Sequence, residues 1–238
     1  MDFKDKNILV VGGSSGIGLS LVNMLASQGA QVYNASRTRS EDWPESLIHI
    51  PLDVLTDIDL LAEQLPENLH GLVYAVGSIN LKPFSRYTED EFINDYKLNV
   101  IGAARTIQLS YKSLRKSGAS SIVLLSSVAA KTGMPYHASI AAAKGGVESL
   151  ALSLAAEFAS QNIRVNVVAP SLTDTPLAGN LLNTPEKREA SAKRHPLGRI
   201  GKPEDIASAI SFLLSDASGW ISGQVIGIDG GMGKLKTM

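Results

Sequence analysis

Short apolar runs rich in β-branched residues alternate with longer amphipathic stretches along most of the chain. A short continuous apolar run, bounded by turn residues, is typical of a strand that is buried on both faces of a sheet. The runs predict strands at residues 7–11, 31–35, 47–51, 69–75, 121–125, 163–168 and 224–228.

The stretches between these runs carry apolar residues at helical spacing. They predict helices at residues 18–27, 58–64, 89–114, 141–160 and 203–214. Strands that alternate with helices pair in parallel through right-handed crossovers. We therefore expect the α/β fold class, as a Rossmann-type doubly wound parallel sheet of about seven strands with helices on both faces. Because the composition does not change along the chain, we interpret residues 1–238 as a single domain.

Residues 173–199 interrupt the alternation, because they are polar and contain three prolines, Pro176, Pro185 and Pro196. The segment follows the sixth predicted strand, at the carboxyl edge of the sheet where open α/β folds bind ligands. We interpret it as a mobile flap over the ligand site. The alternative is a solvated surface excursion.

Composition and charge restrict the partners of the protein. A formal net charge of -1, with 19% charged and 44% hydrophobic residues, gives no field that would attract nucleic acid or an anionic membrane. We expect small molecules and other subunits as partners. Cysteine is absent and the four histidines lack ligand-like spacing, so we predict no disulfide, no thiolate zinc and no catalytic metal. The apolar run near the first residue is too short for a signal peptide, which predicts a cytoplasmic location.

The first predicted strand leads directly into a glycine-rich loop, GGSSGIG at residues 12–18, and then into a helix. Glycines allow a tight turn, and the free amides and dipole of the helix N-terminus favour a bound phosphate. In this strand-to-helix context the loop predicts a dinucleotide pyrophosphate site. Its predicted contacts are Gly12, Ser14, Ser15, Gly16, Ile17 and Gly18.

The GxxxGxG spacing of this loop resembles that of short-chain dehydrogenases/reductases, and the resemblance continues over essentially the whole chain. Further matching segments occur in order at residues 52–54, 74–77, 98–100, 126–127, 144–146, 164–170, 196–205 and 229–231. The resemblance extends to the β-ketoacyl carrier-protein reductases of that family. It implies that a pyridine nucleotide also contacts Asp53, Val54, Ala75, Gly77, Pro170, Thr173 and Thr175.

The end of the second predicted strand bears on which dinucleotide is bound. A carboxylate there bonds the ribose 2′-hydroxyl of NAD, whereas a cation accommodates the 2′-phosphate of NADP. By resemblance Ser36 stands where NAD-preferring members carry Asp, and Arg37 follows it. We therefore favour NADP(H) over NAD(H), because arginine binds phosphate through paired donors. The alternative is that Arg37 and Arg39 are solvated loop cations.

The resemblance also implies catalytic residues, and one of them is missing. Family members use a tyrosine acid four residues before a lysine, together with a serine and an asparagine. Here Asn99, Ser127 and Lys144 match the last three, but Ile140 occupies the tyrosine position. A hydrocarbon cannot transfer a proton, and loss of a positioned acid commonly costs about 10²- to 10⁴-fold in rate.

Two neighbouring residues are candidates for the missing acid. If the helix extends back that far, Tyr136 shares a face with Ile140 about one turn away. His137 precedes Lys144 by seven residues, a spacing that resembles enoyl carrier-protein reductases. Each also has a simpler interpretation: Tyr136 as a packing aromatic and His137 as a polar residue of the first helical turn.

Together these features predict an NADP(H)-dependent oxidoreductase that transfers hydride to or from a carbonyl or conjugated alkene, with a non-standard proton donor. Lys144 would hold the nicotinamide ribose, a role that does not need the tyrosine. The alternative is a non-catalytic dinucleotide-binding sensor or assembly partner, because Ile140 removes the usual acid. The resemblance implies a homo-oligomer, tetramer or dimer, that assembles through the helix of Lys144 and the last strand.

Overall fold

The fold is known from a computed structural model, which describes residues 1–236; residues 237 and 238 of the predicted domain lie outside the described residues. The described strands form one parallel sheet in the order β3-β2-β1-β4-β5-β6-β7. They are β1 (Asn7–Val11), β2 (Gln31–Ser36), β3 (Ile48–Pro51), β4 (Gly71–Tyr74), β5 (Ser120–Leu125), β6 (Ile163–Pro170) and β7 (Val225–Ile228). The predicted α/β fold class is confirmed. The strand order reverses direction between β1 and β4, which is where doubly wound folds bind ligands.

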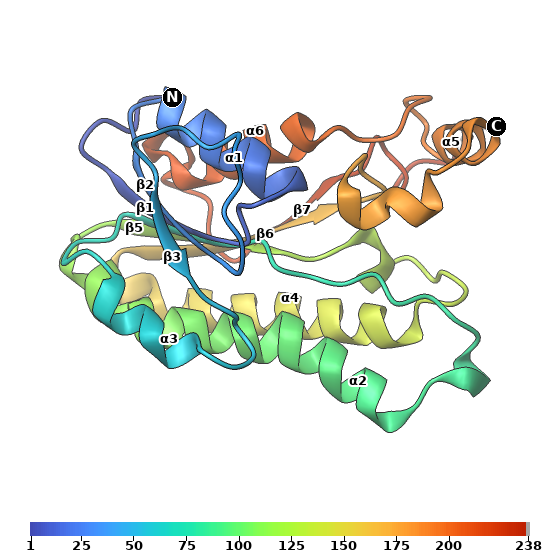
Figure 1. The fold of residues 1–238 in the computed structure, drawn as a ribbon, viewed down its shortest axis with the longest axis horizontal. Coiled ribbons are helices and arrows are strands. Elements are labelled where there is room, and N and C mark those ends of the chain that lie inside the picture. The colour runs from blue at the N-terminus through green and yellow to red at the C-terminus, as the bar shows by residue number, and fades with distance from the viewer. Residues whose placement is uncertain (237–238) are drawn as a thin grey trace.

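Helices cover both faces of this sheet. They are α1 (Gly16–Ser27), α2 (Glu89–Tyr96), α3 (Gly102–Lys116), α4 (Ala138–Phe158), α5 (Pro185–Lys193) and α6 (Pro203–Leu214). Figure 1 shows α1 and α6 on one side of the strands and α2, α3 and α4 on the other. α5 lies apart from both layers, beyond the carboxyl ends of the strands (Figure 1).

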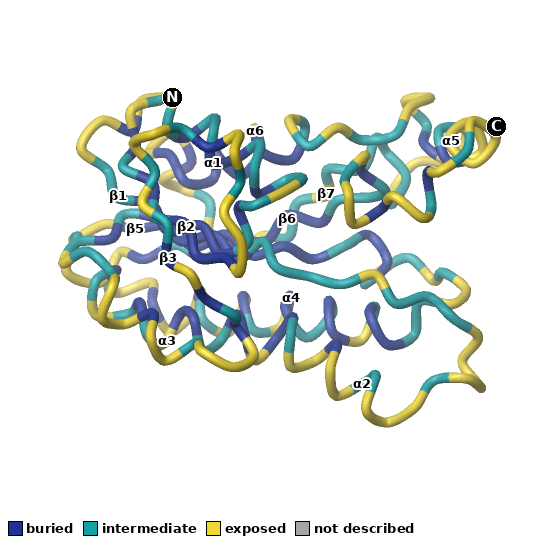
Figure 2. The backbone as a smooth tube through the Cα atoms, viewed as in Figure 1, coloured by how far each residue is buried: buried dark blue, intermediate teal, exposed yellow. Residues whose placement is uncertain are grey.

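The alternation of side chains along each strand supplies two cores. Leu9 points toward the α3 and α4 side, where Ile107 and Phe158 complete one buried cluster. Its neighbour Ile8 points to the opposite face, where Leu21 joins the other cluster. Figure 2 shows the buried residues concentrated in the sheet, while α5 is mostly exposed. Each fully buried Leu or Ile contributes about 1.5–3 kcal/mol to folding.

The predicted helix at residues 89–114 is divided in the structure. A π-helical turn at Lys97–Ile101 separates α2 from α3. The hydroxyl of Tyr74 donates a 2.6 Å hydrogen bond to the carbonyl of Leu98 within this turn. Gly102 begins α3 directly against the same phenol, because a Cβ there would lie 2.2 Å from Tyr74 Oη. The wider turn thus accommodates a side chain from β4, which the sequence pattern of the helix does not indicate.

Two other segments depart from the predicted elements. Residues Ile58–Gln64 form a 3₁₀ helix in place of the predicted α-helix. The segment interpreted as a flap contains a 3₁₀ helix at Pro176–Leu181 and also α5. The hydroxyl of Thr184 accepts a hydrogen bond from the amide of Lys187, and Pro185 occupies the first turn of α5. Both features favour a helix start. Within residues 1–236, no helix is both long and apolar enough to span a lipid bilayer.

The contact between Gly102 and Tyr74 gives a prediction about stability. Gly102→Ala should destabilise the protein by about 1–3 kcal/mol, because the new methyl group overlaps the phenol oxygen. In a Tyr74→Phe background the same substitution should cost less, since that oxygen is gone and alanine favours the helix. Urea unfolding of the four proteins measures both costs. An equal cost in both backgrounds would show that the overlap is not the cause.

Candidate active site

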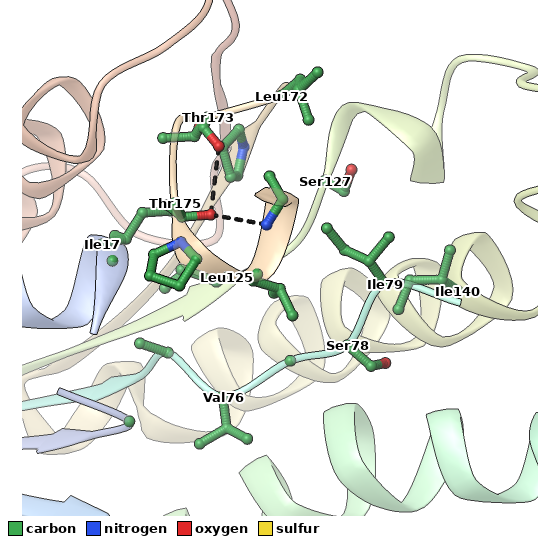
Figure 3. Close-up of a pocket in the computed structure, with 18 of the residues that line it drawn as sticks. Ile17, Val76, Ser78, Ile79, Leu125, Ser127, Ile140, Leu172, Thr173 and Thr175 are labelled. Atoms are coloured by element: carbon green, nitrogen blue, oxygen red, sulfur yellow. Dashed lines mark hydrogen bonds between the residues drawn. The ribbon is translucent and has the colours of Figure 1, made fainter. Parts of the chain in front are cut away.

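A cavity of about 820 Å³ lies at the carboxyl ends of the strands. Its walls come from the loops that follow β1, β2, β3, β4, β5 and β6, from the start of α4 and from α5. Figure 3 shows Ser127 and Ile140 reaching this cavity from different elements, with Thr173 and Thr175 across from them. The cavity occupies the place that the strand order predicts for a ligand.

The glycine-rich loop forms one end of the cavity, and all six of its predicted contact residues line it. Gly12 and Gly16 have φ angles of 95° and 54°, which residues with side chains rarely adopt. A Cβ on Gly18 would lie 2.1 Å from the carbonyl oxygen of Gly12, so the loop and the first turn of α1 are in backbone contact. Ser15 precedes α1 and its side chain makes no capping hydrogen bond. The helix N-terminus is therefore suited to an anion.

Two residues that the sequence reasoning missed hold this loop in place. The amide of Gly13 donates a 2.8 Å hydrogen bond to Oδ1 of Asn34, a fully buried residue of β2. The indole of Trp43 donates a 2.8 Å hydrogen bond to the carbonyl of Gly13. Asn34 is a polar residue inside a predicted buried strand, and that was the available signal, because buried polar groups require hydrogen-bond partners.

The ends of β2 and β3 and the loops after them form the next part of the wall, where Ser36 and Arg37 from β2 and its loop, and Asp53 and Val54 from the loop after β3, line the cavity. The hydroxyl of Ser36 is engaged locally, since it accepts from Asn34 Nδ2 at 3.0 Å and donates to the carbonyl of Thr38 at 2.8 Å. Arg37 is exposed and has no ion-pair partner among residues 1–236. Its guanidinium is thus available to an anionic ligand.

Ser127 and Lys144 line the other end of the cavity. The Ser127 side chain accepts a 3.2 Å hydrogen bond from the amide of Ala129, which leaves its hydroxyl proton free to donate. Lys144 is buried and donates to the carbonyl of Leu125 at 2.8 Å. Burial lowers the pKa of Lys144 to about 8, although the charge of Asp95 acts in the opposite direction.

Asn99 lies behind the cavity wall, where it is buried and does not line the cavity. Its Nδ2 donates to the backbone carbonyl of Asp95 at 2.8 Å, while its Oδ1 has no hydrogen-bond partner among residues 1–236. A Cβ on Gly77 would lie 3.4 Å from this oxygen and 3.3 Å from Nζ of Lys144. The absence of a side chain at Gly77 therefore lets Asn99 and Lys144 approach the same stretch of backbone, and both Gly77 and Ala75 line the cavity.

A buried carboxylate that the sequence reasoning missed connects this region to α4. Asp95 accepts hydrogen bonds from the hydroxyls of Ser78 at 2.7 Å and Ser139 at 2.6 Å. Ser139 immediately precedes Ile140, so the bond fixes the first turn of α4 against α2. The carboxylate is stabilised by hydrogen bonding to both hydroxyls, which is what a buried charge requires.

The start of α4 lies between Tyr136 and Ile140, the position of the missing tyrosine. Ile140 is buried and lines the cavity. The helix begins at Ala138, so it does not extend back to Tyr136 as the prediction for that residue required. Tyr136 has a left-handed φ of 69°, is 59% exposed and does not line the cavity. The expected shared helix face is therefore wrong, because the backbone turns away before the first helical residue.

His137 does line the cavity. Its Nδ1 lies 2.7 Å from the carbonyl oxygen of Pro135. Because a carbonyl only accepts hydrogen bonds, Nδ1 carries a proton in this arrangement. Nε2 is then the nitrogen that remains to exchange a proton with a ligand.

The loop after β6 completes the site, and Pro170, Thr173 and Thr175 all line the cavity. Thr175 Oγ1 donates to the carbonyl of Thr173 and accepts from the amide of Ala178 (Figure 3). Sequence reasoning missed a hydrogen-bonded pair in this wall, His195 and Ser171. Nε2 of the buried His195 lies 2.8 Å from the hydroxyl of Ser171.

These groups fit a phosphorylated dinucleotide. The helix N-terminus and the tight glycine turns suit a pyrophosphate, and Arg37 is an available cation. Ser127 and Lys144 lie at the opposite end from Arg37, next to the position of the missing tyrosine.

Comparison with known proteins agrees with this geometry. The family described as enoyl-(acyl carrier protein) reductase matches residues 11–233. A tropinone reductase homolog of Arabidopsis thaliana is 35% identical over 95% of this chain and 92% of its own length. The ligand-free aldohexose dehydrogenase of Thermoplasma acidophilum superimposes with a TM-score of 0.90 at 26% identity, over 99% of this chain and 98% of that chain.

A second solved structure is the gluconate 5-dehydrogenase of Burkholderia cenocepacia in complex with NADP and tartrate. It superimposes with a TM-score of 0.91 at 25% identity, over 99% of this chain and 98% of that chain. The matches extend over nearly the full chain in sequence and in structure. This protein therefore belongs to the short-chain dehydrogenase/reductase family of oxidoreductases.

Proposed function

We propose that this protein is an NADP(H)-dependent oxidoreductase that transfers hydride to or from a carbonyl or a conjugated alkene, with His137 in place of the usual tyrosine acid. The observation that carries the proposal is one cavity shared by the glycine-rich loop, Arg37, Ser127, Lys144 and His137. The nicotinamide ring of the bound cofactor would supply or accept the hydride.

The cofactor half of the proposal depends on the wall from β1 to β3. The amides at the start of α1 would hold the pyrophosphate, and Arg37 would bind the adenine ribose 2′-phosphate. Asp53 and Val54 would contact the adenine. Lys144 would hold the nicotinamide ribose, and Pro170 and Thr173 would contact the carboxamide, with Thr175 near the phosphates. The gluconate 5-dehydrogenase relative was solved with NADP, which supports a pyridine nucleotide in this cavity.

The proton half depends on two side chains. The hydroxyl of Ser127 donates to the substrate oxygen and polarises the carbonyl. His137 in its imidazolium form donates from Nε2, while Nδ1 stays bonded to the carbonyl of Pro135. In the reverse direction the neutral imidazole accepts the proton at Nε2. Asn99 and Asp95 fix the surrounding backbone and do not touch the substrate.

The second candidate function is a dinucleotide-binding protein without turnover. Ile140 favours it, because a buried hydrocarbon occupies the position of the family's acid. This candidate predicts NADPH binding without oxidation of NADPH by any ketone, aldehyde or enone. Binding and turnover assays on the same preparation separate the two functions.

We also propose a homo-oligomer that assembles through the outer face of α4 and the region before β7. Leu152 of α4 is 61% exposed, and Trp220 is fully exposed. Gly145 has open space where a side chain would project, which allows another helix to approach closely. Exposed apolar groups of this kind are typical of protein interfaces.

The selectivity for the cofactor can be tested at Arg37. Arg37→Gln should weaken NADPH binding by about 10- to 100-fold, because charge-assisted hydrogen bonds to the phosphate are lost. Binding of NADH should hardly change. Arg39→Gln is the matched control, since Arg39 is also exposed but does not line the cavity. Calorimetric titration with both nucleotides measures these affinities. Equal losses for NADPH and NADH, or equal effects of the two variants, would contradict the assignment.

The proton donor can be tested at His137. His137→Gln should lower turnover by about 10²- to 10⁴-fold, because glutamine cannot exchange a proton, while NADPH binding is retained. Tyr136→Phe is the control, because it removes only a hydroxyl that lies outside the cavity. NADPH oxidation with a panel of ketones, aldehydes and enones measures turnover. Full activity of His137→Gln would exclude His137 as the donor, and a comparable loss in Tyr136→Phe would show that the effect is not specific to His137.

The lowered pKa of Lys144 predicts how stability depends on pH. Below about pH 8 the lysine is protonated in both states, and its burial opposes folding. Between about 8 and its ordinary pKa of 10.5 the folded state binds fewer protons than the unfolded state, so stability rises with pH. The free energy of unfolding of the wild type should therefore rise from pH 7.5 to pH 9.5 relative to Lys144→Met. Urea unfolding at both pH values measures this difference, and parallel pH dependence in the two proteins would refute the shift.

A further inference from the structure

The charged side chains that line the cavity are unequal in sign. Among the described residues that line it, the cations are Arg37, Lys144, Lys187 and Arg194, and Asp53 is the single carboxylate. The proposed function uses Arg37, Lys144 and Asp53 for the cofactor. Lys187 and Arg194 remain without a role, and both come from the segment that contains α5.

The two remaining cations share one face of α5. Three further residues follow Lys187 at intervals of three, four and seven positions, namely Ala190, Ser191 and Arg194. Arg194 is the C-cap residue of α5. That spacing places these four residues in one row along the helix, which we call the α5 row. All four line the cavity, so the row faces the site.

The other cations of α5 are neutralised by carboxylates away from this row. Arg188 pairs with Asp174 at 2.7 Å, and Lys193 pairs with Glu189 at 2.6 Å. Asp174, Glu189, Arg188 and Lys193 do not line the cavity.

The cavity-facing cations have only neutral partners within residues 1–236. Nζ of Lys187 donates to the carbonyl of Asn180 and to Oδ1 of Asn183. Arg194 donates from Nη2 to the hydroxyl of Ser191 at 3.0 Å. Ser191 is buried, so its hydroxyl holds the guanidinium against the cavity wall, while the other guanidinium N–H groups of Arg194 have no hydrogen-bond partner in the described part of the chain. An anion at this position would meet a charge that the protein itself does not neutralise.

The wall also carries apolar residues. Val128, Met134, Ile140, Leu177 and Leu181 line the cavity together with Ser127 and the α5 row. A substrate that contacts both Ser127 and Arg194 would therefore present hydrocarbon as well as its two polar groups. Such a wall favours a molecule with a reactive carbonyl, a short apolar body and a charged group.

We propose that the two cations of the α5 row, Lys187 and Arg194, bind an anionic group of the substrate. The preferred substrates are then carbonyl or enone compounds that carry a carboxylate. This inference rests on the proposed oxidoreductase function and defines its substrate class. The planar fork of Arg194 suits a carboxylate, which it can bind through two parallel hydrogen bonds. Lys187 adds a second positive charge on the same helix face.

The test uses matched substrates with and without the charge. NADPH oxidation is measured with keto acids and enone acids of increasing chain length and with their methyl esters. The acids should have a higher kcat/KM than their methyl esters. Arg194→Gln and Lys187→Gln should each lower the kcat/KM of the acids by about 10- to 100-fold. The ester rates and the NADPH affinity should not change. Lys193→Gln is the control, because it removes an exposed cation of α5 that does not line the cavity.

Two further substrates distinguish the source of the anion. Acetoacetyl phosphopantetheine and acetoacetyl pantetheine differ only by a phosphate. The ratio of their kcat/KM values is compared with the ratio for acids over esters. If the first ratio is larger, the anion is a phosphate and the carboxylate assignment is overturned. Equal rates for acids and esters, or an equal effect of Lys193→Gln, would refute the α5 row while leaving the oxidoreductase function intact.

The outcome without turnover is also decisive. If the protein binds NADPH but oxidises none of it, the proposed function fails, and ligand-observed NMR on the NADPH complex tests the α5 row alone. Binding of the acids but not the esters, lost in Arg194→Gln, would support an anion site. Absence of that difference would refute it.

Discussion

No side chain fits at Gly13 or Gly18, where the loop after β1 turns into α1. A Cβ on Gly18 would meet the carbonyl oxygen of Gly12 at 2.1 Å, and a Cβ on Gly13 would meet Asn34 Oδ1 at 2.2 Å. These contacts bring the start of α1 against the end of β1, so the helix N-terminus faces the cavity. The hydrogen bond that Gly13 donates to Asn34 and the one that Trp43 donates to Gly13 hold the loop in that conformation. The rest of the site is arranged around this fixed end of the cavity.

The opposite end is organised by buried charges. Lys144 and Asp95 are both buried, and each has hydrogen-bond partners, namely the carbonyl of Leu125 for the lysine and the hydroxyls of Ser78 and Ser139 for the carboxylate. Removing one partner from such a network leaves a desolvated polar group and is costly. The network therefore orients the first turn of α4 whether or not residue 140 can transfer a proton. This is a physical reason why an isoleucine can occupy that position without disrupting its surroundings.

The sequence predicted those parts of the molecule whose cause is local. Two-sided burial leaves a continuous apolar run, so the strands were predicted with small boundary errors, as for β2 at Gln31–Ser36. The glycine-rich loop after the first strand, residues 12–18, predicted a set of contact residues, and all of these line the cavity. The π-helical turn was missed, because it depends on the phenol of Tyr74, which lies 24 residues before Leu98. The roles of Asn34 and Asp95 were missed for the same reason. Tyr136 was misplaced because a left-handed residue before α4 leaves no apolar pattern.

Ile140 has a consequence beyond the loss of an acid, since it separates two tasks that one tyrosine–lysine pair would share. The ammonium of Lys144 bonds to the carbonyl of Leu125 and has a hydrocarbon rather than a phenol four residues before it. Under the proposed function it still binds the ribose, but it has no tyrosine phenol to acidify for proton transfer to the substrate oxygen. Under the proposed function the proton then comes from His137, which lines the cavity wall with its Nδ1 already engaged. If the proposed function holds, hydride positioning depends on β5 and α4, whereas protonation depends on the turn before α4, so a substitution in one region should leave the other task intact.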